Sequence, residues 1–258
     1  MAKPIKVQIV DASKEGKMRG CDEIIITPSK EVQPDETIPN SKALNNVIQG
    51  HLEFFQTAQY ALLLSANDRI MTCEEYLLKK QPQELSEIDI ITYFAVVAML
   101  HDALKYAYNS LIPLPPNATK EQKNAFVQTD KQIFVKSIDE IKKFLKQVFD
   151  LTDDEANKFT IADDEVIEML RSLIFAHSCQ TDHAGFLGKY NNAKLQFYSP
   201  WAYVYQKSIN LRIYYKEQMF DLKISIEEIK LYVEFLHGKI LELKEKVESE
   251  AKKDPQKA

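Results

Sequence analysis

The segment that most constrains the fold of this chain is residues 88 to about 112. Between residues 90 and 100 almost every position is apolar, and a helix that is apolar on all sides must be surrounded by other elements. The preceding Ser86-Glu-Ile-Asp89 has the pattern of a capping box, which starts a helix. Prolines within residues 113–116 end it. The sequence therefore predicts a helical bundle with this helix in its middle.

A second long helix is predicted after Ser225-Ile-Glu-Glu228, which also has the pattern of a helix start. Apolar residues then recur at alternating steps of four and three, a spacing typical of one helix packing along another. These residues are Ile229, Val233, Leu236, Ile240, Leu243 and Val247. The pattern fits packing on the chain's own bundle, and it also fits a seam between two copies of the chain.

Two more helices are expected, over residues 41 to about 66 and over residues 67–80. Further helix starts are predicted at Thr119, at Thr152 and at Asp163 or Asp164. Residues 178–200 are polar and irregular, which predicts a long loop.

Two segments have the alternating pattern of β-strands, residues 5–27 and residues 203–225 with a turn near 216–218. The expected fold class is therefore mainly α, a helical bundle with two small β-ribbon additions. In this division, residues 1–40 form an N-terminal β-ribbon and linker. Residues 41–249 form the helical domain with a β-hairpin insertion near 203–225, and residues 250–258 form a disordered tail.

Composition narrows the function classes. The net charge is −5, so any contact with nucleic acid must come from a local basic patch and not from the whole surface. Three cysteines without paired spacing argue against a disulfide framework or a cysteine-based zinc site. No apolar run approaches the roughly 20 residues of a membrane span, and the N-terminus lacks a secretory signal. We therefore expect a cytoplasmic protein with no membrane contact. The sequence has no glycine-rich phosphate loop, and no cofactor is expected.

The strongest candidate site is the stretch Arg171-Ser-Leu-Ile-Phe-Ala-His177. A guanidinium is a fixed cation suited to phosphate, and an imidazole can transfer protons near neutral pH. Residues six apart on an ideal α-helix differ by about 240° in angle, so the two side chains converge only if the helix ends near Ala176. Asp182 and His183 then lie close enough in sequence to orient His177.

An arginine followed after four to six residues by a histidine, at the end of a helix late in a helical bundle, resembles the signature of the HEPN family (higher eukaryotes and prokaryotes nucleotide-binding). The matching region is about residues 86–184. The resemblance implies a metal-independent endoribonuclease, or an RNase-derived effector of a bacterial defence or toxin system, acting as a homodimer. HEPN proteins often carry Asn, Asp or His directly after the arginine, where this chain has Ser172.

The HEPN resemblance also implies a division of labour at the site. Arg171 stabilises the charge on the phosphate oxygens, and His177 acts as general base or acid. Because the attacking group is the ribose 2′-OH, the substrate must be RNA. Tyr198, Trp201 and Tyr203 are candidate RNA-binding residues, since exposed aromatic rings can stack on unpaired bases.

Two alternatives remain open. The step Leu-His101-Asp102, with Lys105 three residues further on, resembles the core of the HD phosphohydrolase family. That resemblance implies a divalent metal held by His101 and Asp102, with His51 as a candidate upstream ligand, and hydrolysis of a phosphate ester. In the other alternative the chain is a catalytically silent helical interaction module. Lys105 then simply pairs with Asp102, and Arg171 pairs with Glu168 at an i,i+3 spacing.

Overall fold

The computed structural model describes residues 39–112, 114–176, 197–215 and 217–253. By their contacts, residues 38–258 form a unit of their own. The β-ribbon expected within residues 5–27 lies outside the described residues.

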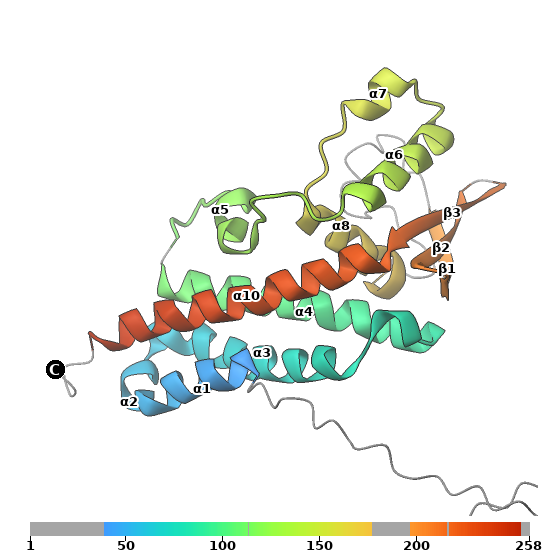
Figure 1. Ribbon diagram of the computed structural model, residues 1–258. Helices are drawn as coiled ribbons and strands as arrows, with labels where there is room; N and C mark the ends of the chain where they lie inside the picture. Colours follow the sequence, from blue (N-terminus) through green and yellow to red (C-terminus); the bar gives the residue numbers. More distant parts are fainter. Residues whose placement is uncertain (1–38, 113, 177–196, 216, 254–258) are drawn as a thin grey trace, which may run out of the picture. The chain divides into compact units, whose positions relative to one another are not determined.

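The predicted central helix is confirmed as α4 (Glu87–Leu111). The Ser86 side chain accepts a hydrogen bond from the Asp89 backbone N–H at 3.3 Å and so caps its start. The side chains of Ile90, Phe94 and Val97 are almost completely buried. α4 packs against α3 (Ala61–Lys79) and against α10 (Ile226–Ala251), which crosses the bundle beside it (Figure 1). The apolar pattern thus predicted both the helix and its central place.

Where one helix was expected over residues 41–66, the chain breaks twice. The structure has α1 (Asn40–Gly50), α2 (Leu52–Phe55) and a 3₁₀ turn (Ala58–Tyr60) before α3 begins. At His51 the backbone leaves the helical region, with φ −129° and ψ 35°. The break turns Phe55 into the core, where its ring centroid lies 5.1 Å from that of Tyr60. The tertiary packing of these rings therefore outweighs the local preference for a continuous helix.

The middle of the chain contributes shorter helices. These are α5 (Lys120–Asn124), α6 (Val135–Phe149), α7 (Asp153–Asn157), α8 (Asp163–Leu170) and a π-helical segment (Arg171–Ala176). Thr119 and Thr152 form the predicted capping boxes. Asp163 does not act as an N-cap, because Ala162 takes that place. Its buried carboxylate instead accepts hydrogen bonds from the backbone N–H groups of Ile133 and Phe134, both at 2.9 Å.

The predicted hairpin is confirmed and enlarged to a three-stranded antiparallel sheet. Its strands β1 (Phe197–Tyr205), β2 (Ser208–Tyr215) and β3 (Gln218–Ser225) pair in the order of the sequence. β1 begins inside the segment that was expected to be a loop. One face of the sheet is buried through Ile209, Leu211 and Leu222. Part of this burial comes from α6, whose Phe144 ring lies 5.8 Å from that of Phe220.

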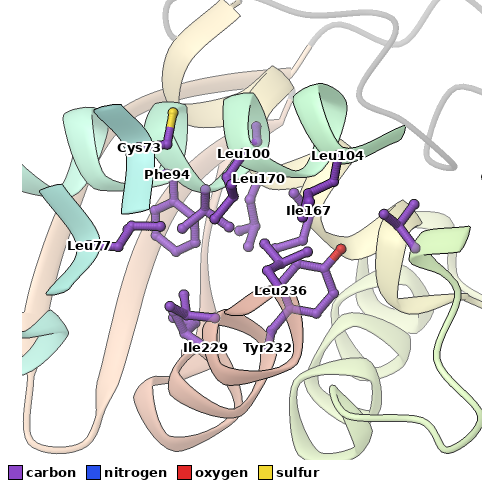
Figure 2. Packing of buried hydrophobic residues seen from close by; sticks show 14 of the residues in the cluster. Cys73, Leu77, Phe94, Leu100, Leu104, Ile167, Leu170, Ile229, Tyr232 and Leu236 are labelled. Atoms are coloured by element: carbon purple, nitrogen blue, oxygen red, sulfur yellow. The ribbon is translucent and has the colours of Figure 1, made fainter. Parts of the chain in front are cut away.

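α10 uses its apolar seam inside the chain. All six seam residues are at most 7% exposed, and the helix contacts α1, α3 and α4. This confirms packing on the chain's own bundle, so the seam is not available between two copies. Figure 2 shows Tyr232 and Leu236 of α10 meeting Ile167 of α8 and Leu104 of α4 in the core.

The expectation of a disordered tail from residue 250 is wrong at its start. Ala251 is 3% exposed, and Glu250 accepts a hydrogen bond from the Tyr60 hydroxyl at 2.7 Å. This contact holds the end of α10 against the turn before α3. Residues 254–258 lie outside the described part. Among the described helices, none combines the length and the apolar character that crossing a membrane requires.

Candidate functional site

A cleft of about 720 Å³ lies where α4, α5 and α8 approach one another. α4 supplies one wall, the segment around α5 a second, and α8 with the first π-helical residue a third. The lining consists of Ala98, His101, Asp102, Lys105, Tyr106, Asn109, Leu114, Pro115, Lys120, Lys123, Asn124, Asp164, Ile167, Glu168 and Arg171. Four of these side chains are basic and three are acidic. The cleft therefore carries the local positive excess that the acidic composition of the whole chain does not suggest.

The Asp102 carboxylate lies close to three cationic or titratable side chains of the cleft. Its Oδ1 lies 2.8 Å from Lys105 Nζ and 3.6 Å from His101 Nδ1, and its Oδ2 lies 3.5 Å from Arg171 Nη1. Partial burial by itself raises the pKa of this carboxyl. The polar contacts and charges of His101 and Lys105 outweigh that effect and hold the pKa of Asp102 well below its usual range. Asp102 is therefore an anion that ties α4 to the end of α8.

Arg171 lies at the junction of α8 and the π-helical segment. The ion pair with Glu168 that its spacing allowed is not formed, because Glu168 binds Lys120 Nζ at 2.6 Å. The guanidinium reaches Asp102 instead and keeps a partly exposed side chain, and its Nε is buried without a hydrogen-bond partner. π-helical turns occur frequently at functional sites. The two motifs that suggested competing functions, Arg171 and His101-Asp102, thus line one cleft.

Three side chains of the cleft have a buried polar atom that no hydrogen bond satisfies. These atoms are His101 Nε2, Asn109 Oδ1 and Arg171 Nε. In the described part of the chain only seven buried side-chain atoms are in this state, so the cleft holds a large share of them. His101 is 7% exposed. Buried polar groups are normally hydrogen-bonded, which indicates that a ligand or bound water completes this site.

Several cleft residues were not predicted from the sequence. Lys120, Lys123 and Asn124 follow the proline-rich segment and reach the cleft only because that segment folds back on α4. Their one sequence signal is the Thr119 capping box, which fixes the start of α5. Capping residues say nothing about what a helix faces.

The other predicted site residues have different outcomes. His177, Asp182 and His183 lie outside the described residues, so their approach to Arg171 stays a prediction. The ideal-helix angle does not apply to it, because residues 171–176 are π-helical. Ser172 is buried, at 6% exposed, and does not line the cleft.

The predicted RNA-binding aromatics all lie on β1. The side chains of Tyr198 and Trp201 are outside the described part of the chain. The ring of Tyr203 lies 5.9 Å from the Arg212 guanidinium carbon and does not line the cleft. A role for these rings in stacking stays a prediction.

The alternative metal set is not brought together. His51 lines a separate hollow with Glu248 and Lys252 near the end of α10, whereas His101 and Asp102 line the cleft. Within the described residues there is no group of three or more His, Cys, Asp or Glu that could hold a metal ion. The physical reason is that His51 lies at the end of α1, away from the cleft. The Asp102 carboxylate in turn pairs with the side chains of Lys105 and Arg171.

Comparisons with protein-family models, with curated proteins and with solved structures found no match. The resemblances to the HEPN and HD families therefore depend on the residues quoted for them, and the site is argued from its own chemistry.

Proposed function

We propose that the cleft binds a phosphodiester of RNA. On this proposal the protein is a HEPN-like, metal-independent endoribonuclease or an RNase-derived effector of a bacterial defence or toxin system, acting as a cytoplasmic homodimer. The observation that carries the proposal is the place of Arg171. Its guanidinium lines a cleft together with Lys105, Lys120 and Lys123, beside a buried imidazole with a free ring nitrogen.

The chemistry follows from the charges. Arg171 and Lys123 neutralise the non-bridging phosphate oxygens, and Lys123 forms no ion pair with another described residue that would compete with this role. The ribose 2′-OH attacks the adjacent phosphorus, and the bond from phosphorus to the 5′ oxygen breaks. His177 takes the proton of the 2′-OH or gives one to the departing 5′ oxygen, and a water molecule makes the other of these two proton transfers. The products are a 2′,3′-cyclic phosphate and a 5′-hydroxyl.

The test is cleavage of mixed RNAs with and without EDTA. We expect the wild type to cleave in both conditions, and His177→Ala and Arg171→Ala to lose cleavage. Arg69→Ala is the matched control, because Arg69 is an exposed arginine of α3 that does not line the cleft. Far-UV circular dichroism of Arg171→Ala checks that α4 and α8 stay folded without the contact to Asp102.

The HD-like alternative stays an outcome of the same test, because His101 and Asp102 both line the cleft, although no third metal ligand among the described residues joins them. In the HD-like alternative the protein hydrolyses a phosphate ester with a divalent metal. EDTA then abolishes phosphate release, and His101→Ala loses it while His177→Ala does not. That pattern would replace the ribonuclease proposal. If the wild type neither cleaves nor binds RNA and releases no phosphate, the chain is an interaction module.

A further inference from the structure

Tyr106 is an exposed aromatic residue in the lining of the cleft. The residue is 51% exposed although it lines the cavity, and Lys105 Nζ lies 5.2 Å from the centre of its ring. An exposed aromatic ring beside a cation can serve as a platform for an unpaired base, because every base has a π-face that can stack. Nothing in the packing of α4 requires an aromatic ring at this exposed position.

Asn109 lies one helical turn beyond Tyr106, and the orientation of its amide is determined by its neighbour. Asn109 Nδ2 donates to the backbone carbonyl of Lys123 at 3.0 Å. A carbonyl can only accept, so the NH₂ group must face Lys123 and Oδ1 must face away. Oδ1 is buried and has no donor in the described part of the chain. Asn109 Oδ1 can therefore accept a hydrogen bond from an N–H group of a ligand.

The residue that holds Arg171 and the unsatisfied amide lie about one nucleotide apart along α4. Asp102, which binds Arg171, and Asn109 are separated along α4 by about 10 Å, at 1.5 Å per residue. That span is comparable with the length of a nucleotide from its phosphate to the outer edge of its base. A phosphate at Arg171 therefore puts a base beside Tyr106 and Asn109.

The charge of the lining argues for a single phosphate. Besides Asp102, the acidic side chains are Asp164, which accepts from Asn124 Nδ2 at 2.9 Å, and Glu168, which binds Lys120. They leave the four basic residues an excess of only one positive charge. A groove that follows an RNA backbone needs many cations, so binding here must draw on the base as well.

We infer that the part of the cleft lined by Tyr106 and Asn109 is a base subsite, which holds one unpaired base of the RNA whose phosphate lies at Arg171. Tyr106 stacks on the base, and Asn109 Oδ1 accepts from an exocyclic amino group, as adenine and cytosine present. The inference rests on the proposed function and names the nucleotide class that the site selects.

The test compares AMP, CMP, UMP and ribose 5-phosphate by isothermal titration calorimetry. All four carry the same phosphate, so differences report the base. We expect AMP and CMP to bind about 5- to 150-fold more tightly than ribose 5-phosphate, the range of one stacked base. Tyr106→Ala removes this advantage and Tyr106→Phe retains it. Asn109→Leu brings AMP and CMP to the level of UMP, and Arg171→Ala weakens all four ligands alike.

Tyr214→Ala is the matched control, since Tyr214 is an exposed tyrosine of β2 outside the cleft. Equal affinity for AMP and ribose 5-phosphate in the wild type overturns the base subsite. If RNA is still cleaved in that case, the proposed function stands. If none of the four ligands binds and RNA is not cleaved, the proposed function fails and the subsite with it.

Discussion

Replacing Glu228 with alanine is expected to destabilise the protein strongly, because the buried carboxylate of this α10 residue caps the start of α6. Glu228 is 4% exposed. Its Oε1 accepts from the Lys136 backbone N–H at 2.6 Å, and its Oε2 accepts from the Ser137 backbone N–H at 2.9 Å and from the Ser137 hydroxyl. The Ser137 hydroxyl oxygen in turn accepts from the Ser225 backbone N–H at 3.0 Å. One carboxylate therefore joins α6, β3 and α10.

The magnitude follows from the three donors that lose their partner. A buried donor left without an acceptor costs about 1–3 kcal/mol. The Lys136 N–H is near an exposed side chain and regains water more easily than the two donors of Ser137. We therefore expect Glu228→Ala to lower the free energy of unfolding by about 3–5 kcal/mol. Glu228→Gln keeps one acceptor and should lose less.

The neighbouring residue supplies the control. Glu227 pairs with Lys136 Nζ at 3.0 Å, but both side chains are about 70% exposed, and such a pair contributes little. Urea unfolding followed by far-UV circular dichroism measures the midpoint of each variant, which falls in proportion to the lost stability at constant m-value. A midpoint for Glu228→Ala no lower than that for Glu227→Ala would refute the capping argument.

Three further predictions concern the fold. Contacts with His101 and Lys105 outweigh burial and hold the pKa of Asp102 well below its usual range. The ionised Asp102 therefore stabilises the fold fully above the ordinary aspartate pKa of about 3.9. This contribution is lost as the pH falls from there through the lower pKa of the folded state. Urea midpoints should fall over this acid range more for the wild type than for Asp102→Asn, and parallel curves would contradict this. Gly238→Ala, within α10 where an added Cβ meets no atom within 4 Å, should raise stability by about 0.5–1 kcal/mol, and a lower urea midpoint would count against it. Burial, opposed only by the nearby charge of Arg69, raises the pKa of the Cys73 thiol to about 11. A variant with serine at the other two cysteines should therefore react with Ellman's reagent only after unfolding. Fast labelling of the native protein would show instead that this thiol is accessible.

The parts of the fold that could be predicted from the sequence are those determined within a few residues. Ser86, Thr119, Thr152 and Ser225 each cap the helix that their pattern predicted, since a cap needs only the residue three positions further on. The alternating steps of four and three in α10 predicted a buried face for the same reason. They did not decide between the chain's own bundle and a second copy, because both surfaces have the same pattern.

The remaining features depend on residues far apart in the chain. The break at His51 turns Phe55 into the core, where it packs against the Tyr60 ring of the following turn. Asp163 has the spacing of a cap, yet it binds the backbone before α6, because burial there leaves those N–H groups without water.

For the candidate site, the sequence by itself determined which chemical groups are present and on which helices they lie. It marked Arg171 and the His101-Asp102 step as separate hypotheses, each with an ion pair at i,i+3 as its alternative. In the tertiary structure the i,i+3 ion pair forms between Asp102 and Lys105. Glu168 pairs with Lys120 and not with Arg171, and Arg171 pairs with Asp102. The physical reason is that helical periodicity determines a residue's face, whereas the partner opposite that face is chosen by the packing of the whole bundle.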